Sequence, residues 1–146
     1  MNLYDPISKI MTTELITVSP NDPLSDVIAI FEREGIHHLP VIQQGELVGI
    51  VSSVDILGYT RSFYMEGEQS DAHLPQEESA VVSDIMTTKL AKMEPTDRIE
   101  VALEVFKENK FHSILITEGQ KLKGIVTTFD IINVLAKHGS AETSYN

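Results

Sequence analysis

The sequence contains no cysteine and no tryptophan, and it has half as many cationic as acidic side chains. Without cysteine, the chain can form neither a disulfide framework nor a thiolate metal site. The 11 lysine and arginine residues against 22 aspartate and glutamate residues give a formal net charge of −11. Because phosphate groups attract clustered cations, this balance disfavours nucleic acids and anionic membranes as partners.

Long apolar runs are also missing, so we expect no segment to span a bilayer. Residues 1–6 lack the basic start and the apolar stretch of a signal peptide. These two features, with the lack of cysteine, favour a cytoplasmic protein. Hydrophobic residues still make up 42% of the 146, a proportion typical of a chain that folds around a core.

The patterns of the common catalytic sites are absent from the sequence as well. It has no Gly-x-Ser-x-Gly elbow, no glycine-rich phosphate loop, and no pair of histidines spaced to bind zinc on one helix face. We therefore predict no catalytic residue, no metal ligand and no enzymatic activity.

The clearest feature that is present is an internal repeat, because a shift of 75 residues overlays the sequence on itself without a gap. Residues 8–13, Ser-Lys-Ile-Met-Thr-Thr, align with residues 83–88, Ser-Asp-Ile-Met-Thr-Thr. The aligned identical residues further along include Pro20 and Pro95, Asp22 and Asp97, Phe31 and Phe106, His37 and His112, and Asp55 and Asp130. A duplicated domain explains such a long period better than a solenoid does.

Each copy has the pattern of a β-α-β-β-α unit, which predicts an α+β fold. A first helix follows an expected cap at Asp22, with Pro23 at the first helical position, and Asp97 with Glu100 forms an expected capping box in the second copy. A glycine, Gly35, is expected to end the first helix. The expected strands are 15–18, 38–42 and 47–51 in one copy and 90–93, 113–117 and 122–126 in the other, and the final helices begin near Ser53 and Thr128.

The repeat divides the chain into two domains with a linker between them. We assign residues 1–62 and 81–138 to the repeats, residues 63–80 to an acidic linker and residues 139–146 to a flexible tail. The acidic linker could instead hold a metal ion, although charge runs are usually solvated.

A hydroxyl residue precedes an aspartate by three positions where a strand leads into a helix: Ser52 before Asp55, and Thr127 before Asp130. This pattern is typical of a helix capping box. It also suits a sugar site, because the carboxylate can accept hydrogen bonds from a ribose diol while the hydroxyl faces a sugar or phosphate oxygen. Both interpretations can hold together.

The junction occurs twice in the chain. Residues 16–20 and 37–41 precede it in the first copy, and residues 91–95 and 112–116 precede it in the second. Together these segments resemble the CBS domain family. The resemblance covers about residues 6–60 and 81–137. It implies two CBS repeats packed as a pseudo-twofold pair, with clefts that bind AMP, ADP, ATP or S-adenosylmethionine as a ligand, and no required cofactor. Its expected ligand-binding residues are Ile16, Thr17, Val18, His37, Pro40, Ser52 and Asp55 in one site, and Ala91, Lys92, Met93, His112, Thr127 and Asp130 in the other.

In this resemblance, the backbone near Thr17 and Lys92 would pair with adenine, and Asp55 and Asp130 would bind ribose. The second copy differs from the family pattern, because it has Lys92-Met93 and Leu115-Ile116 where the first has Thr17-Val18 and Pro40-Val41. The second site could therefore be altered or empty. Basic residues that could reach a phosphate are Arg61, Lys92, Arg98 and Lys110.

The resemblance predicts a regulatory ligand-sensing module that acts through a separate effector protein and forms a homodimer. Two alternatives stay open. The clefts could be vestigial in a protein-interaction scaffold, or the acidic chain could sense a divalent cation.

Overall fold

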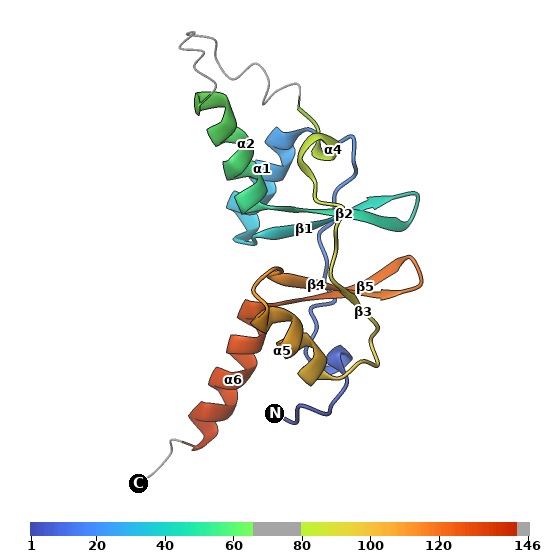
Figure 1. Ribbon diagram of the computed structural model, residues 1–146, viewed down its shortest axis with the longest axis vertical. Helices are drawn as coiled ribbons and strands as arrows, with labels where there is room; N and C mark the ends of the chain where they lie inside the picture. The colour runs from blue at the N-terminus through green and yellow to red at the C-terminus, as the bar shows by residue number, and fades with distance from the viewer. Residues whose placement is uncertain (66–79, 143–146) are drawn as a thin grey trace. The chain divides into compact units, whose positions relative to one another are not determined.

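A computed structural model describes residues 1–65 and 80–142 of the chain. It divides the chain into two compact units, whose elements are labelled in Figure 1. Unit 1 consists of Met1–Leu15 and Leu90–Asn146, and unit 2 of Ile16–Lys89. The fold is mixed α+β, as the sequence predicts, with helices packed on small sheets.

Unit 2 is built on a β-hairpin with helices packed against it. β1 and β2 pair antiparallel, with Leu39 opposite Val51. The turn between them contains Gly45 at φ +78°, a backbone conformation that glycine adopts without strain. The elements of unit 2 are α1 (Leu24–Glu34), β1 (His38–Gln43), β2 (Glu46–Ser52), α2 (Ser53–Met65) and α4 (Val82–Ile85).

Unit 1 repeats this design and adds one strand. β3 pairs parallel with β4, and β4 pairs antiparallel with β5, so β4 is the central strand. Gly119 at φ +61° takes the turn position that Gln44, at φ +52°, has in unit 2. The elements of unit 1 are η1 (Ile7–Lys9), β3 (Lys92–Met93), α5 (Ile99–Lys107), β4 (Ser113–Glu118), β5 (Lys121–Thr127) and α6 (Thr128–Glu142).

Each unit combines segments from both sequence copies. The Ile7 N–H donates to the Asp97 carbonyl at 2.7 Å in unit 1, and the Val82 N–H donates to the Asp22 carbonyl at 2.9 Å in unit 2. Further along, Thr12 exchanges two backbone hydrogen bonds with Ile125, and Thr87 exchanges two with Ile50. The start of each copy therefore completes the hairpin of the other copy. We call these starts, residues 1–15 and 80–89, the exchanged segments.

The exchanged segments also enter the two hydrophobic cores. Ile7 packs in unit 1 among buried residues of α5, β4 and β5. Val82 packs in unit 2 among buried residues of α1, β1 and β2. Both side chains are fully buried, so the cores depend on residues from distant parts of the sequence.

The expected caps of the first helix in each copy are wrong, each by one residue. α1 begins after Pro23 and α5 after Arg98, and neither has a side-chain cap. The carboxylates of Asp22 and Asp97 instead accept from the N–H groups of Ser19 and Glu94, within the preceding turns. Backbone carbonyls of the exchanged segments accept hydrogen bonds from N–H groups at the helix starts. The Ala80 carbonyl accepts from Leu24, the Asp5 carbonyl from Ile99, and the Leu3 carbonyl from Glu100. The exchanged segments thus satisfy N–H groups that a cap would otherwise bind.

The expected strand at residues 15–18 is reduced to a single bridge between Val18 and Val41. In unit 1 the equivalent segment forms β3, where the Leu115 N–H donates to the Ala91 carbonyl at 2.9 Å. Pro40 occupies the position of Leu115 in unit 2 and has no N–H to donate to Ile16. The pairing of this segment with β1 in unit 2 is therefore one backbone hydrogen bond shorter than the pairing of β3 with β4 in unit 1.

The other expected elements are confirmed, with ends that differ by one or two residues. Gly35 ends α1 at φ +64°, and the two hairpins and the two final helices lie where the sequence places them. α6 continues to Glu142, past the expected start of the tail at residue 139, while residues 143–146 and 66–79, with most of the expected linker, lie outside the described residues. No helix in the described part of the chain is both long and apolar enough to cross a membrane.

Methionines of the exchanged segments lie close against glycines of the hairpins. A Cβ atom built on Gly49 would lie 2.8 Å from Met86 Sδ and 3.1 Å from the Thr87 carbonyl oxygen. The same arrangement places Gly124 against Met11 and the Thr12 carbonyl. These glycines allow the exchanged segment to approach the strand closely.

We expect Gly49→Ala to lower the free energy of unfolding by about 1–3 kcal/mol, because the added methyl group meets both a side chain and backbone. Gly58→Ala is the matched control, since Gly58 lies within α2 with nothing within 4 Å of its Cβ position. Alanine should stabilise that position slightly. Urea denaturation of the two variants measures both effects, and equal stability of Gly49→Ala and the wild type would contradict the close approach.

Candidate ligand-binding site

The junction between β2 and α2 holds a reciprocal pair of hydrogen bonds. The Ser52 N–H donates to Asp55 Oδ2 at 2.8 Å, and the Asp55 N–H donates to Ser52 Oγ at 3.1 Å. The predicted capping box is therefore confirmed in unit 2. Asp55 Oδ1 accepts no hydrogen bond from any described residue, and both side chains are half-buried. One carboxylate oxygen and the Ser52 hydroxyl proton thus remain available to a ligand.

The equivalent junction between β5 and α6 carries more hydrogen bonds. The Thr127 N–H and hydroxyl both donate to Asp130 Oδ2, at 2.8 and 3.0 Å. The Thr12 hydroxyl, from the exchanged segment, donates to Asp130 Oδ1 at 3.5 Å. Protein groups therefore contact both carboxylate oxygens of Asp130, and the Thr127 hydroxyl proton is committed to the same aspartate.

The segment at residues 16–18 lies beside β1 in unit 2. The Val18 N–H donates to the Pro40 carbonyl at 3.0 Å, and the Val18 carbonyl accepts from the Ile42 N–H at 2.8 Å. Alternate residues of a strand direct their backbone groups to opposite edges, so the N–H and carbonyl of Thr17 point away from β1. Within the described part of the chain nothing binds these two groups. They form a free donor and acceptor pair at an exposed residue.

The free edge of Thr17 and the junction of Asp55 lie at the same end of β1. Val18 bridges to Val41, and His38 at the start of β1 pairs with Ser52 at the end of β2. The segment 16–18 and β2 therefore flank β1, about 10 Å apart across two strand spacings. Because the free groups of Thr17 point away from β1, the free edge and the carboxylate of Asp55 lie on opposite sides of β1.

The predicted histidines lie at the end of β1 and β4 where the junctions are. His37 is exposed, its Nδ1 lies 3.4 Å from Ser53 Oγ, and its carbonyl accepts from the Ser53 N–H. His112 is also exposed, and its carbonyl accepts from the Thr128 N–H. The backbone of each histidine thus holds the first residue of the final helix, while its ring faces solvent.

The remaining predicted site residues also keep their places within one unit. Ile16 is half-buried against the core of unit 2 and Pro40 is buried. In unit 1, Met93 is buried, Ala91 is half-buried and Lys92 is exposed. The two sets of predicted residues therefore fall on separate units, one set on each.

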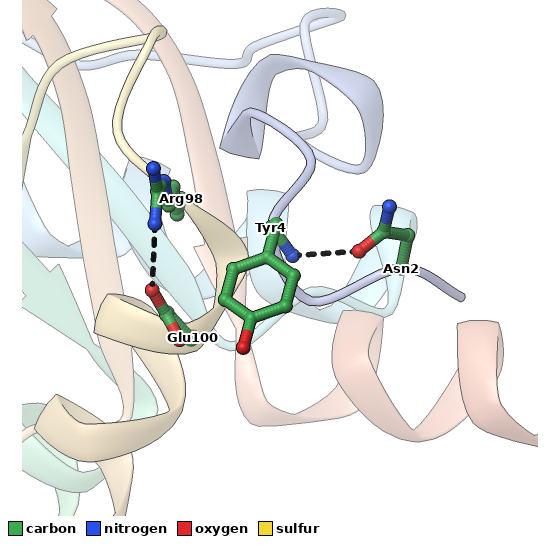
Figure 2. Close-up of polar contacts among 4 residues, drawn as sticks. All are labelled: Asn2, Tyr4, Arg98 and Glu100. Atoms are coloured by element: carbon green, nitrogen blue, oxygen red, sulfur yellow. Dashed lines mark hydrogen bonds and ion pairs between the residues drawn. The ribbon is translucent and has the colours of Figure 1, made fainter.

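Arg98, one of the basic residues considered for phosphate binding, is engaged with other groups. Figure 2 shows its guanidinium directed at Glu100, with Nη1 3.4 Å from Oε1. The same guanidinium lies 5.5 Å from the ring centroid of Tyr4, in a cation–π arrangement. This residue is thus less suited to a ligand phosphate. The other three candidates, Arg61, Lys92 and Lys110, are exposed.

The contact of Thr12 with Asp130 is the feature of the site that the sequence analysis missed. Residues 11–13 and 86–88 are identical in the two copies, which marks them as part of the repeat. Nothing in the pattern indicates that the first of these segments reaches the aspartate at the opposite end of the chain. The exchange of segments between copies brings the two residues together.

Comparisons with known proteins identify the family and the fold of the chain. The family model described as "CBS domain" matches residues 7–62 and 82–137. Protein MJ1225 of Methanocaldococcus jannaschii is 24% identical over 131 residues, which cover 89% of this chain and 47% of that protein. Its crystal structure has a TM-score of 0.83 over 92% of this chain and 49% of that one, at 22% identity. The chain thus spans about half the length of MJ1225.

Two solved structures of similar length contain ligands. The structure of CBSX2 in complex with AMP has a TM-score of 0.75 at 23% identity, covering 92% of this chain and 98% of that one. The CBS domain pair of protein MJ0100, in complex with 5′-methylthioadenosine and S-adenosyl-L-methionine, has a TM-score of 0.73 at 19% identity, covering 91% and 97%. At these identities, the likeness establishes the fold. With both copies matched by the family model, the chain belongs to the CBS domain family as a tandem pair.

Proposed function

We propose that this CBS pair is a regulatory module that binds an adenosine-containing small molecule and catalyses no reaction. The observation that carries the proposal is the carboxylate of Asp55, which keeps one oxygen free of donors from the described residues at the junction between β2 and α2. A carboxylate accepts hydrogen bonds from both hydroxyls of a ribose, and a free strand edge offers adenine a donor and an acceptor. Two related structures, which contain AMP and adenosine-derived sulfur compounds, support this ligand class.

The distribution of cations favours a ligand with little negative charge. Only three of the eleven lysine and arginine residues, Arg33, Arg61 and Lys89, belong to unit 2. Arg33 forms an ion pair with Glu34 at 3.0 Å. A triphosphate requires converging cations, because its charge is otherwise stabilised only by water. Adenosine itself or S-adenosylmethionine therefore suits this unit better than ATP does, with AMP intermediate.

Isothermal titration calorimetry of the full chain with adenosine, AMP, ATP and S-adenosylmethionine tests the proposal. We expect binding of at least one compound, with the weakest binding for ATP. Because a ligand that binds only the folded state stabilises it, the same compound should raise the melting temperature. No heat and no thermal shift with any of the four compounds would contradict the proposal and favour the scaffold hypothesis.

Regulation would act in the cytoplasm through a separate effector protein that distinguishes the free and the bound chain. A ligand shifts a conformational equilibrium only if it binds the two states with different affinities. The proposed module therefore needs a partner that recognises one of these states.

We also propose that the module is a homodimer, because the final helix of each sequence copy exposes large apolar side chains. In α2, Val54 and Leu57 are 73% and 68% exposed. In α6, Phe129 and Ile132 are 65% and 60% exposed, and Leu135 adds a third residue at the same spacing. Residues three apart lie on one face of a helix, so each helix carries an apolar stripe that a second copy could cover.

We expect the double variant Leu57→Glu, Ile132→Glu to elute as a monomer under conditions in which the wild type is a dimer. Each substitution would place a charge in a buried apolar contact, which is costly without a partner. Size-exclusion chromatography with light scattering measures the mass. Val101→Glu is the control, since Val101 lies on α5 and is 44% exposed. A monomeric wild type, or a variant that stays dimeric, would overturn the dimer proposal.

A further inference from the structure

The only sulfur atoms of this chain belong to its five methionines, because the sequence contains no cysteine. Two of them, Met11 and Met86, hold equivalent positions in the repeat, one in each exchanged segment. Both side chains are half-buried, so solvent reaches part of each. Met93, by contrast, is only 6% exposed in the core of unit 1. A small oxidant in solution therefore has better access to Met11 and Met86 than to Met93.

The thioethers of Met11 and Met86 lie against glycines of the two hairpins. A Cβ atom built on Gly124 would lie 2.7 Å from the Sδ atom and 2.9 Å from the Cγ atom of Met11. One built on Gly49 would lie 2.8 Å and 3.2 Å from the same atoms of Met86. Each methionine also packs against the hydrophobic core of its unit. A further atom on the sulfur cannot be placed on the glycine side without displacing the exchanged segment.

The residue after each methionine holds the exchanged segment to the hairpin. Thr12 exchanges backbone hydrogen bonds of 2.9 and 3.0 Å with Ile125, and Thr87 exchanges bonds of the same lengths with Ile50. A shift of the methionine is passed directly to these bonds, because the threonine is its neighbour in the chain. The methionine side chain and the backbone of the threonine thus form one attachment of each exchanged segment.

We propose that hydrogen peroxide oxidises Met11 and Met86 to methionine sulfoxide, and that this modification releases the exchanged segments from the hairpins. In the reaction, the thioether sulfur attacks one peroxide oxygen, the O–O bond breaks and an S–O bond forms. The sulfur loses two electrons and the peroxide gains them. The second peroxide oxygen leaves as water with both hydrogens.

The added oxygen opposes the packing of the side chain in two ways. It enlarges the sulfur where the glycine lies close, and it makes an apolar side chain polar. A polar oxygen kept against the hydrophobic core without a hydrogen-bond donor is costly, so the oxidised side chain favours a position in water. Moving there pulls on the neighbouring threonine and weakens its bonds to the hairpin.

The exchanged segments are also the covalent connections between the two units. Residue 15 ends the first part of unit 1 and residue 16 begins unit 2, which ends at residue 89 before unit 1 resumes at residue 90. Release of both segments therefore acts on both units at once. Because methionine sulfoxide reductases restore the thioether, the modification is reversible. A chain without cysteine would in this way respond to peroxide through methionine, whether or not it binds a nucleoside.

The test treats the full-length wild type with hydrogen peroxide and follows it by peptide mass spectrometry and amide hydrogen exchange. We expect sulfoxide to form at Met11 and Met86 before it forms at Met93, because susceptibility follows exposure. The N–H groups of Ile50 and Ile125, which donate to the two threonines, should then exchange about tenfold faster. Incubation with methionine sulfoxide reductases should restore slow exchange.

Three variants assign the effect to these methionines. The double variant Met11→Leu, Met86→Leu has side chains of similar volume without sulfur, so peroxide should leave its exchange unchanged. Met93→Leu is the matched control and should respond as the wild type does. Met86→Gln places a polar group at one position without any oxidant. It should speed exchange at Ile50 and not at Ile125, and it tests the release even if the double variant fails to fold.

Complete sulfoxide formation at Met11 and Met86 with unchanged exchange at Ile50 and Ile125 would overturn the proposal. Oxidation of Met93 at the same rate would do so as well, because it would show that peroxide reacts with the unfolded chain. A response of the double leucine variant equal to that of the wild type would assign the effect to other methionines. None of these measurements involves a ligand, so their outcome is independent of the proposed function.

Discussion

Replacing Ile7 by alanine should lower the free energy of unfolding by about 3 kcal/mol and loosen the strands of the other sequence copy. Ile7 belongs to the first copy by sequence, but its side chain is fully buried in unit 1, in the same cluster as Ile99, Ile114 and Val126. Alanine would leave a cavity there, because the surrounding side chains are held by two strands and a helix. Equilibrium denaturation with urea measures the loss.

Amide hydrogen exchange shows where the loss occurs. In Ile7→Ala the amides of β4 and β5 should exchange faster than those of β1 and β2, whereas Val82→Ala should have the opposite effect, since Val82 is fully buried in unit 2. Leu3→Ala is the control, because that side chain is 38% exposed and should change the stability by less than about 0.5 kcal/mol. Faster hydrogen exchange in β1 and β2 of Ile7→Ala would show that each copy packs on its own start segment. The exchange of segments between the copies would then be wrong.

The exchange itself could not be predicted from the sequence, and the reason is the repeat. Residues 8–13 and 83–88 are nearly the same, so either segment carries the apolar and backbone groups that either hairpin needs. A periodicity argument identifies a buried residue such as Ile7 but does not say which of two similar surfaces covers it. The packing of the whole unit decides between the two, and it is not encoded in a local pattern.

The wrong caps have the same origin. Asp22 and Asp97 have the residue type and the spacing of helix caps, and local propensity therefore favours that role. In the structure, each carboxylate accepts from a backbone N–H in the turn before the helix. Carbonyls from a segment distant in the sequence accept from the N–H groups at the helix start. Tertiary contacts override a cap preference of about 1 kcal/mol when they supply the hydrogen bonds in another way.

The features that the sequence did predict depend on residues close together in the chain. Gly35 ends α1 with a positive φ, and Ser52 with Asp55 forms the expected reciprocal bonds. The loss of the strand at residues 15–18 could also have been anticipated, because a proline cannot donate to a neighbouring strand. That consequence becomes visible only once Pro40 is known to lie beside Ile16 rather than at an open edge.

Replacing Asp55 by alanine should weaken binding of the adenosine compound by roughly 1–3 kcal/mol, a loss of about 5- to 150-fold in affinity. The carboxylate is half-buried and uses Oδ2 for the Ser52 N–H, which leaves Oδ1 for ligand hydroxyls. Removing both oxygens deletes the cap and the ribose acceptor together. Stability should also fall by about 1 kcal/mol, the usual effect of losing an N-terminal cap.

The two roles of Asp55 can be separated by comparing variants at positions with and without the ribose function. Asp84→Ala removes a carboxylate that accepts from the Val81 N–H at 2.9 Å at the start of α4, a different helix from the one that Asp55 caps. It should lower stability without a change in affinity, whereas Asp55→Ala lowers both. Calorimetry gives the affinities and urea denaturation the stabilities. If Asp55→Ala lost stability but bound adenosine as tightly as the wild type, then the aspartate would serve only as a helix cap.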